Sequence, residues 1–191
     1  MKSASRTVLS MLCFFLFAGL ALADSVAIAV PSPGTTTVGS TIVVDVNISS
    51  IADLYAFQLD LAFNPAVLSA VSVSEGSFLP SGGTTSFVPG SIDNVGGSIT
   101  FNADTLIGTI PGVTGGGSLL SFDFLAIGNG VSALNLQNAL FLDSSLNNLS
   151  VTMQNGSATV NSAVVSTPEP ASSLLILVGA LAAGVLLKLR R

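Results

Sequence analysis

The chain has 191 residues, with ten carboxylates against five basic side chains, one cysteine, and neither histidine nor tryptophan. Every basic residue lies near one terminus or the other, and they are Lys2, Arg6, Lys188, Arg190 and Arg191. This distribution excludes nucleic-acid binding, because no interior cation is available to displace counterions from a phosphate backbone.

The side chains that are present also argue against catalysis. The one thiol, Cys13, lies in an apolar run near the N-terminus, so the rest of the chain has no disulfide, no thiolate metal site and no cysteine- or histidine-based mechanism. Paired carboxylates are the remaining option. Three of the four candidate aspartates fall at outward positions of separate predicted strands, where solvated carboxylates are ordinary; the four are Asp45, Asp60, Asp104 and Asp123. We therefore expect no enzymatic activity.

A short apolar segment, residues 8–22, follows two basic residues at the N-terminus. It ends at small residues, with Ala21 and Ala23 in the A-x-A arrangement that signal peptidase cleaves. This order predicts a secretory signal peptide over residues 1–23, and hence an exported protein. A retained membrane anchor is the alternative, which the shortness of the run disfavours.

Residues 24–165 consist of strand-length runs in which apolar and polar residues alternate, separated by Gly, Pro, Asn and Ser. The clear runs are residues 41–48, 54–63, 98–104 and 118–127, and the less regular ones are 134–142 and 149–153. The side chains predicted to face inward are Ile42, Val44, Val46, Ile48, Tyr55, Phe57, Leu59, Leu61, Phe63, Ile99, Phe101, Ala103, Leu120, Phe122, Phe124 and Ala126.

Strands that are each buried on one face must close against a second sheet. The pattern therefore predicts an all-β, two-sheet sandwich. Residues 81–97 and 109–117 are rich in Gly and Pro, which predicts connections at the ends of the sandwich.

Residues 166–191 form a separate segment, which opens on Pro168, Glu169 and Pro170. The two prolines hold the backbone extended. Residues 171–187 are uncharged and mostly apolar, and a transmembrane helix of this length just spans a bilayer at about 1.5 Å per residue. By the positive-inside rule, the basic residues that follow predict a cytoplasmic C-terminus and an outward-facing domain; they are Lys188, Arg190 and Arg191.

This Pro-Glu-Pro element, apolar helix and basic cluster resemble the PEP-CTERM sorting signal of Gram-negative bacteria that make extracellular polysaccharide. The resemblance implies processing by exosortase, a membrane-embedded cysteine transpeptidase that cuts near the Pro-Glu-Pro element. It implies an inner-membrane-anchored precursor that is released to the cell surface or the extracellular matrix. A plain C-terminal membrane anchor is the alternative.

The central stretch, about residues 26–160, resembles the cohesin family of the cellulosome, whose jelly-roll sandwich is related to carbohydrate-binding modules. The features that carry the resemblance are Gly39 with the alternating run 41–49, the run 54–79 with its Phe63-Asn64-Pro65 corner and Leu68, and the runs 99–104 and 119–130. The resemblance implies a jelly-roll fold for the all-β domain.

A candidate binding face follows from the same resemblance. Type I cohesins carry an Asn and an Asp on the outer face of the third strand to grip the dockerin helix. The aligned positions here hold Ala56 and Gln58, which argues against recognition of that kind of dockerin. The outer face of the third and sixth strands carries over, and we predict that four of its side chains point to solvent and are candidates for binding: Gln58, Asp60, Thr100 and Asn102.

We expect no metal or cofactor, with calcium as the open alternative. Residues 91–94 and 142–145 offer carboxylate and amide oxygens, yet turn formation by Asn and Asp explains both stretches better. Of the phenylalanines in the domain, only Phe78 and Phe87 are predicted near the surface. That argues against an aromatic sugar-binding platform and leaves polar contacts to a polysaccharide open.

Three functions are consistent with these features of the sequence. The favoured one is an exported, non-catalytic surface or matrix protein that binds a protein or polysaccharide partner. The alternatives are a carbohydrate-binding module for exopolysaccharide or plant polysaccharide, and a dockerin-binding cohesin scaffold.

Overall fold

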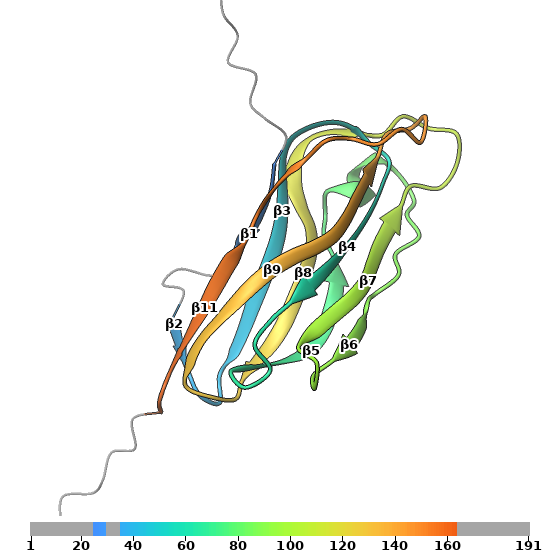
Figure 1. Ribbon diagram of the computed structural model, residues 1–191. Coiled ribbons are helices and arrows are strands. Elements are labelled where there is room, and N and C mark those ends of the chain that lie inside the picture. The colour runs from blue at the N-terminus through green and yellow to red at the C-terminus, as the bar shows by residue number, and fades with distance from the viewer. Residues whose placement is uncertain (1–24, 30–34, 164–191) are drawn as a thin grey trace, which may run out of the picture.

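Two β-sheets lie face to face in the computed structural model, which describes residues 25–29 and 35–163 (Figure 1). The predicted signal peptide, residues 1–23, and the predicted sorting segment, residues 166–191, lie outside the described residues. Among the residues that are described, there is no helix with the length and apolar character needed to cross a membrane.

Both sheets combine strands that are distant in sequence. The five-stranded sheet has the order β10-β1-β3-β8-β5, with bounds β1 (Ser25–Ala29), β3 (Thr41–Leu54), β5 (Leu68–Glu75), β8 (Val113–Ala126) and β10 (Thr152–Gln154). The six-stranded sheet has the order β2-β11-β9-β4-β7-β6, with bounds β2 (Thr35–Thr37), β4 (Ala56–Ala62), β6 (Ser91–Asp93), β7 (Ser98–Thr105), β9 (Gly130–Leu142) and β11 (Gly156–Asn161). The predicted all-β jelly-roll sandwich is confirmed.

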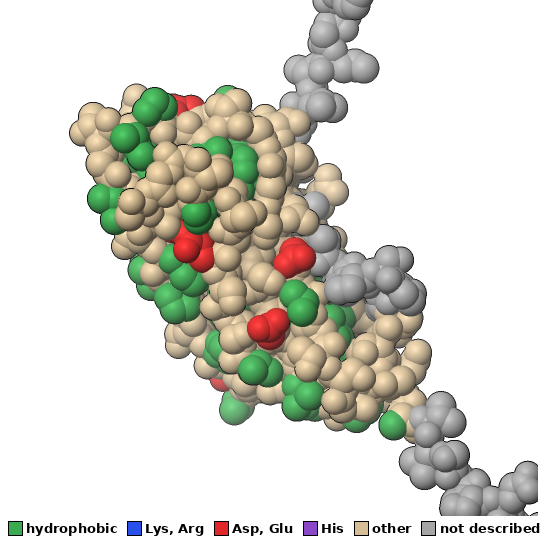
Figure 2. Space-filling model, turned by 180° about the vertical axis from the view of Figure 1, so that it is seen from behind, with side chains coloured by type: hydrophobic (Ala, Val, Ile, Leu, Met, Phe, Trp, Pro, Cys, Tyr) green, Lys and Arg blue, Asp and Glu red, His purple; other side chains and the backbone are tan. Residues whose placement is uncertain are grey.

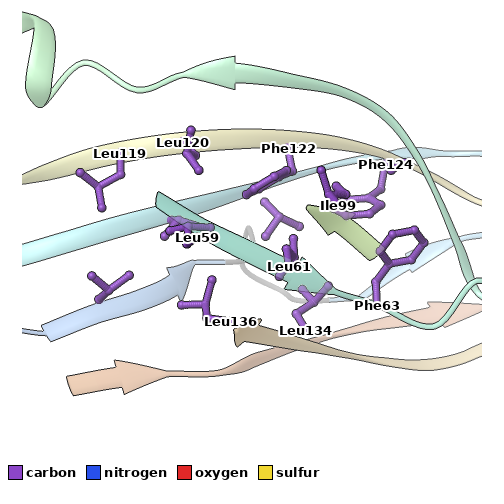
Figure 3. Close-up of a cluster of buried hydrophobic side chains, with 14 of the residues drawn as sticks. Leu59, Leu61, Phe63, Ile99, Leu119, Leu120, Phe122, Phe124, Leu134 and Leu136 are labelled. Atoms are coloured by element: carbon purple, nitrogen blue, oxygen red, sulfur yellow. The ribbon is translucent and has the colours of Figure 1, made fainter. Parts of the chain in front are cut away.

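The inner faces of the two sheets bury one continuous apolar core. Figure 3 shows part of it, with leucine and phenylalanine side chains of both sheets gathered in the space between them. The rings of Phe63 and Phe124 meet edge to face, with centroids 5.1 Å apart. Alternation predicted the inward side chains of β3, β4 and β8 correctly, while Tyr55 is only half-buried and donates its hydroxyl hydrogen to the carbonyl oxygen of Gly108.

Residues 81–97, predicted as a connection, form much of one sheet edge instead. A 3-10 turn, η1 (Leu79–Gly82), leads into residues 84–88, which run beside β7, and β6 follows. The backbone N–H of Ser86 donates to the oxygen of Thr105 at 2.8 Å, and Val88 and Ala103 exchange two backbone hydrogen bonds. This edge segment, defined as residues 84–88, therefore extends the six-stranded sheet locally.

The prediction for residues 109–117 is wrong over its second half, since β8 begins at Val113. The glycines there make room for Phe78, because a Cβ on Gly117 would lie 3.1 Å from the Phe78 ring. Phe78, predicted near the surface, is consequently buried, and Phe87 is half-buried against the core.

One side chain protects the free edge of β5. The amide of Asn94 accepts a hydrogen bond from the N–H of Ala70 at 2.7 Å and donates to the Ala70 carbonyl oxygen at 3.0 Å. It thereby takes the place of a neighbouring strand at the point where β5 approaches β6 of the other sheet. A side chain that occupies the strand edge in this way limits edge-to-edge pairing with other chains.

Replacing Phe122 by alanine tests the core. Phe122 is fully buried, so we expect the free energy of unfolding to fall by about 3–5 kcal/mol through lost transfer energy and a residual cavity. Leu125→Ala is the matched control, since Leu125 lies on the outer face of the same strand, β8, and its loss should cost about 0.5 kcal/mol or less. Urea unfolding of both variants measures the difference, and equal losses would contradict the described packing.

Candidate protein-binding face

The outer side of the six-stranded sheet presents a mixed apolar and polar surface centred on β4. Leu140 of β9, Gln58 of β4 and Ala103 of β7 lie in one cross-strand row, and Val88 of the edge segment continues it. Directly paired residues share a face, so these side chains point the same way. We call this surface the β4 face and define it by Gln58, Asp60, Val88, Phe101, Ala103, Asn138 and Leu140.

Both neighbours of β4 carry one extra residue beside its centre. In β7 the pairing passes from Leu59 with Asn102 to Leu61 with Ile99, so two residues stand opposite one. The strand β9 shows the same shift on the other side of β4. Each bulge holds a residue in the left-handed region, where φ is 62° at Phe101 and 49° at Asn138.

The carboxylate of Asp60 connects the two bulges. One oxygen accepts the backbone N–H of Phe101 at 2.7 Å, and the other accepts the side-chain amide of Asn138 at 2.7 Å. The first bond satisfies a donor that the bulge withdraws from the regular ladder, and a charged acceptor makes such a bond stronger than a neutral one. Asp60, which lies on β4 between the two bulges, thus fixes the centre of the β4 face.

The bulge in β7 overturns two predictions. The inserted residue exchanges the inner and outer faces of everything after it, because side chains alternate with a period of two. Phe101, predicted to face inward, is therefore 56% exposed, whereas Asn102, predicted to point to solvent, is 0% exposed. Ala103, also predicted inward, is on the outer row.

Buried Asn102 has a structural role instead of a binding one. Its amide donates to the carbonyl oxygens of Leu59 at 3.0 Å and Ile99 at 3.2 Å, and its oxygen accepts the N–H of Gly90 at 3.1 Å. It therefore ties β4, β7 and the residue just before β6 together. Of the other predicted face residues, Thr100 is exposed, and Gln58 and Asp60 are half-buried on the outer side.

Sequence analysis missed the apolar members of the β4 face. Phe101 is 56% exposed, Val88 43% and Leu140 41%, so three large apolar side chains interrupt an otherwise polar surface.

A shallow depression of about 280 Å³ lies at the far end of β4 and β9, lined by Ala62, Phe63, Asn64, Val131, Ala133 and Asn135. The opposite side of the molecule shows scattered acidic and apolar patches (Figure 2).

The four aspartates that are candidate catalytic carboxylates in the sequence do not lie together in the structure. Asp45 accepts a hydrogen bond from Ser121, and Asp123 accepts one from Ser72, both on the outer side of the five-stranded sheet. Asp60 lies on the β4 face, and Asp104 is buried between the sheets. No pair therefore flanks an open cleft in the part of the chain that is described.

The two candidate calcium loops use their aspartates for turns. One oxygen of Asp93 accepts the N–H groups of Val95 and Gly96, both at 2.9 Å, and these bonds lower the pKa of Asp93. Hydrogen bonds from Asn147 and Ser145 likewise lower the pKa of Asp143. Within residues 25–29 and 35–163, no three acidic, histidine or cysteine side chains are grouped as a metal site.

Comparison with known proteins agrees with this architecture. The model of the cohesin domain family matches residues 26–160. The chain belongs to the cohesin domain family. Cohesin domains are non-catalytic interaction modules, which agrees with the side-chain inventory.

Solved structures of cohesins share the fold at low sequence identity. A non-cellulosomal cohesin from Archaeoglobus fulgidus is 21% identical with a TM-score of 0.59, over 73% of this chain and 91% of that one. A type II cohesin module of the ScaA scaffoldin of Acetivibrio cellulolyticus is 15% identical with a TM-score of 0.61, over 71% and 96%. The cohesin of a type I cohesin–dockerin complex from Clostridium thermocellum is 13% identical with a TM-score of 0.59, over 74% and 97%. Curated protein sequences give no match.

A pair of alanine variants separates the structural role of Asn102 from the exposed position of Thr100. Asn102→Ala leaves two buried carbonyls and one N–H without their partner, so we expect the free energy of unfolding to fall by about 1–3 kcal/mol. Thr100→Ala should change it by about 0.5 kcal/mol or less. Denaturant unfolding decides, and an Asn102 variant as stable as the Thr100 variant would show that Asn102 faces solvent after all.

Proposed function

We propose that this cohesin domain is a non-catalytic module that binds a protein partner through the β4 face, with Phe101 as its anchor. The observation that carries the proposal is an exposed phenylalanine in a left-handed conformation, which costs about 1–3 kcal/mol and is rare for a bulky residue. Backbone strain of this kind concentrates at functional sites. An aromatic side chain flanked by aliphatic ones is also the composition of a protein interface core.

The charge of the domain narrows the class of partner. The described residues hold eight carboxylates and no basic side chain. Both oxygens of Asp60 are already occupied, so the β4 face offers few free polar groups at its centre. A fitting partner therefore presents an apolar pocket for Phe101 within a neutral or basic surround.

Several cohesins with this fold were solved in complex with dockerins. Here β4 offers Ala56 and Gln58 where the type I pattern has Asn and Asp, while the apolar contact area comes from β7, β9 and the edge segment. The proposed partner is therefore a protein module that contacts Phe101, Val88 and Leu140, and type I dockerins are not its model.

Phe101→Asn tests the anchor without a folding penalty, because asparagine tolerates the left-handed region better than phenylalanine. We expect unchanged or higher stability, together with at least about tenfold weaker partner binding. Val71→Asn is the matched control, since Val71 is 61% exposed at a bulge of β5 on the opposite sheet. The tagged full chain and both variants are produced in the organism that makes the protein and are cross-linked there to bound proteins. The proteins that are retained with the tagged chain on purification are then quantified by mass spectrometry.

Support consists of a protein retained equally by the unchanged chain and Val71→Asn but lost with Phe101→Asn. A protein that is retained equally by the unchanged chain and by Phe101→Asn contradicts the proposal. Retention on an insoluble polysaccharide that is lost with Phe101→Asn would instead assign the β4 face to a glycan.

We further infer that the domain is exported and sorted to the cell surface or extracellular matrix. The support lies in the sequence, where the signal-peptide pattern of residues 1–23 and the PEP-CTERM pattern of residues 166–191 flank the domain.

Intact-mass measurement of the exported protein from an exosortase-bearing bacterium tests the sorting. We expect loss of residues 1–23 and of the apolar segment after Pro170. Replacing Pro168, Glu169 and Pro170 together by alanine should preserve the first cleavage and block the second. An exported protein that still carries its apolar C-terminal segment would refute exosortase processing.

A further inference from the structure

A buried carboxyl group lies between the two sheets on the inner side of β7. Asp104 is 2% exposed, and it faces inward because the bulge at Phe101 reverses the alternation. One of its oxygens accepts the N–H of Thr105 at 2.8 Å, while Oδ2 has no hydrogen-bond partner among the described residues. An ionised carboxylate in such a place lacks the solvation or pairing that its charge requires.

The group that faces Asp104 is a second carboxyl, Glu75, at the end of β5 in the other sheet. From β4, the residue paired with Asp104 is Phe57, which carries no charge. The edge segment contributes Thr85, whose hydroxyl donates to Glu75 at 2.5 Å. The described residues include no basic side chain, so no protein cation is available to neutralise the pair.

Two facing carboxyl groups without a cation are stable when they hold a proton between them. Burial, and after it the proximity and like charge of the Glu75 carboxyl, together raise the pKa of Asp104 to about 7, against a smaller opposing effect of the Thr105 N–H. Below about pH 7, the protonated Asp104 can therefore donate to Glu75 through the oxygen that otherwise has no partner.

The pair connects to the β4 face through the edge segment. Residues 84–88 are bound to β7 on one side, where Val88 and Ala103 exchange hydrogen bonds at 2.8 and 3.1 Å. On the other side Thr85 binds Glu75 of β5. Val88 is a member of the β4 face, so the position of this segment sets the rim of the surface next to Phe101.

We propose that Asp104 and Glu75 share one proton across the seam between the sheets, and that loss of this proton loosens the edge segment and with it the rim of the β4 face. The consequence for partner binding rests on the proposed function. The proton itself does not, since it belongs to the isolated protein.

The direction of the pH effect follows from the raised pKa of Asp104. The folded protein holds this proton at pH values where the unfolded chain has lost it, so folding stability falls as pH rises from about 4 to about 7 and is level above that. Within this window the equilibrium constant for folding should fall by up to about tenfold per pH unit. The aspartates with lowered pKa values act in the opposite direction at lower pH, and they are Asp53, Asp93 and Asp143.

The experiment follows the side-chain carboxyl carbons by NMR between pH 4 and 9, using the full chain in a neutral detergent. The Asp104 carbon should titrate with a midpoint near 7, and Glu75→Gln should lower that midpoint by about one unit or more, because the amide removes a like charge and donates to the carboxylate. Hydrogen exchange of the Val88 and Ala103 amides reports on the edge segment. Their protection factors should fall about tenfold or more between pH 6 and pH 8.

Asp104→Asn supplies a permanent donor to Glu75 and should keep those protection factors constant over the same range. Asp123→Asn, on the outer side of the opposite sheet, should behave as the unchanged chain does. A midpoint for Asp104 near the ordinary carboxyl value of about 4 would overturn the shared proton. A tenfold loss of protection in Asp104→Asn would overturn the link to the edge segment. A midpoint that moves on addition of millimolar calcium would show that a metal, and not a proton, joins the pair.

Discussion

The extra residue that β7 carries opposite Asp60 sets the direction of every side chain after it in that strand. A period-two strand has no way to absorb one inserted residue without exchanging its faces. The exchange brings Phe101 to the surface and turns Asn102 and Asp104 into the space between the sheets. The exposed ring, the buried amide and the buried carboxyl are therefore three consequences of one local irregularity. Regular alternation would have placed each of them on the opposite side.

The two bulges beside β4 each place one residue in the left-handed region, and the two residues differ in how well they suit that conformation. In β9 the left-handed position holds Asn138, a residue suited to that conformation, whose side chain also binds Asp60. In β7 it holds Phe101, which gains nothing from the conformation and loses the burial that its ring would have inside. A requirement for stability alone favours asparagine or glycine at both positions. The presence of phenylalanine at the exposed position is the physical reason to assign it a contact with another molecule.

Alternation was a sufficient guide over the regular parts of the strands. It assigned the inner faces correctly over residues 42–48 of β3, 57–61 of β4 and 120–126 of β8, and with them the sandwich. It failed in β7, because the run from Ile99 to Asp104 reads as flawless alternation with Phe101 inside and Asn102 outside. The bulge is fixed by pairing with β4, where the Asp60 carboxylate captures the displaced N–H, and such a long-range contact leaves no mark in a local pattern. Val88 escaped notice for a similar reason, since its segment reads as a loop until β7 pairs with it.

The described residues carry eight carboxylates and no basic side chain, so their charges must be stabilised by N–H and hydroxyl donors. Asp53 shows the usual solution, accepting hydrogen bonds from Ser144 and Gly112 that join the end of β3 to two loops and lower the pKa of Asp53. Stability from such groups is present above the ordinary carboxyl pKa of about 4 and is lost as pH falls through their lowered values. Asp104 has the opposite dependence, because its proton is lost as pH rises toward 7. The two classes together place the greatest stability of the fold on the acidic side of neutrality. There the turn carboxylates are charged, the seam between the sheets is still protonated, and the rim of the β4 face is held in place.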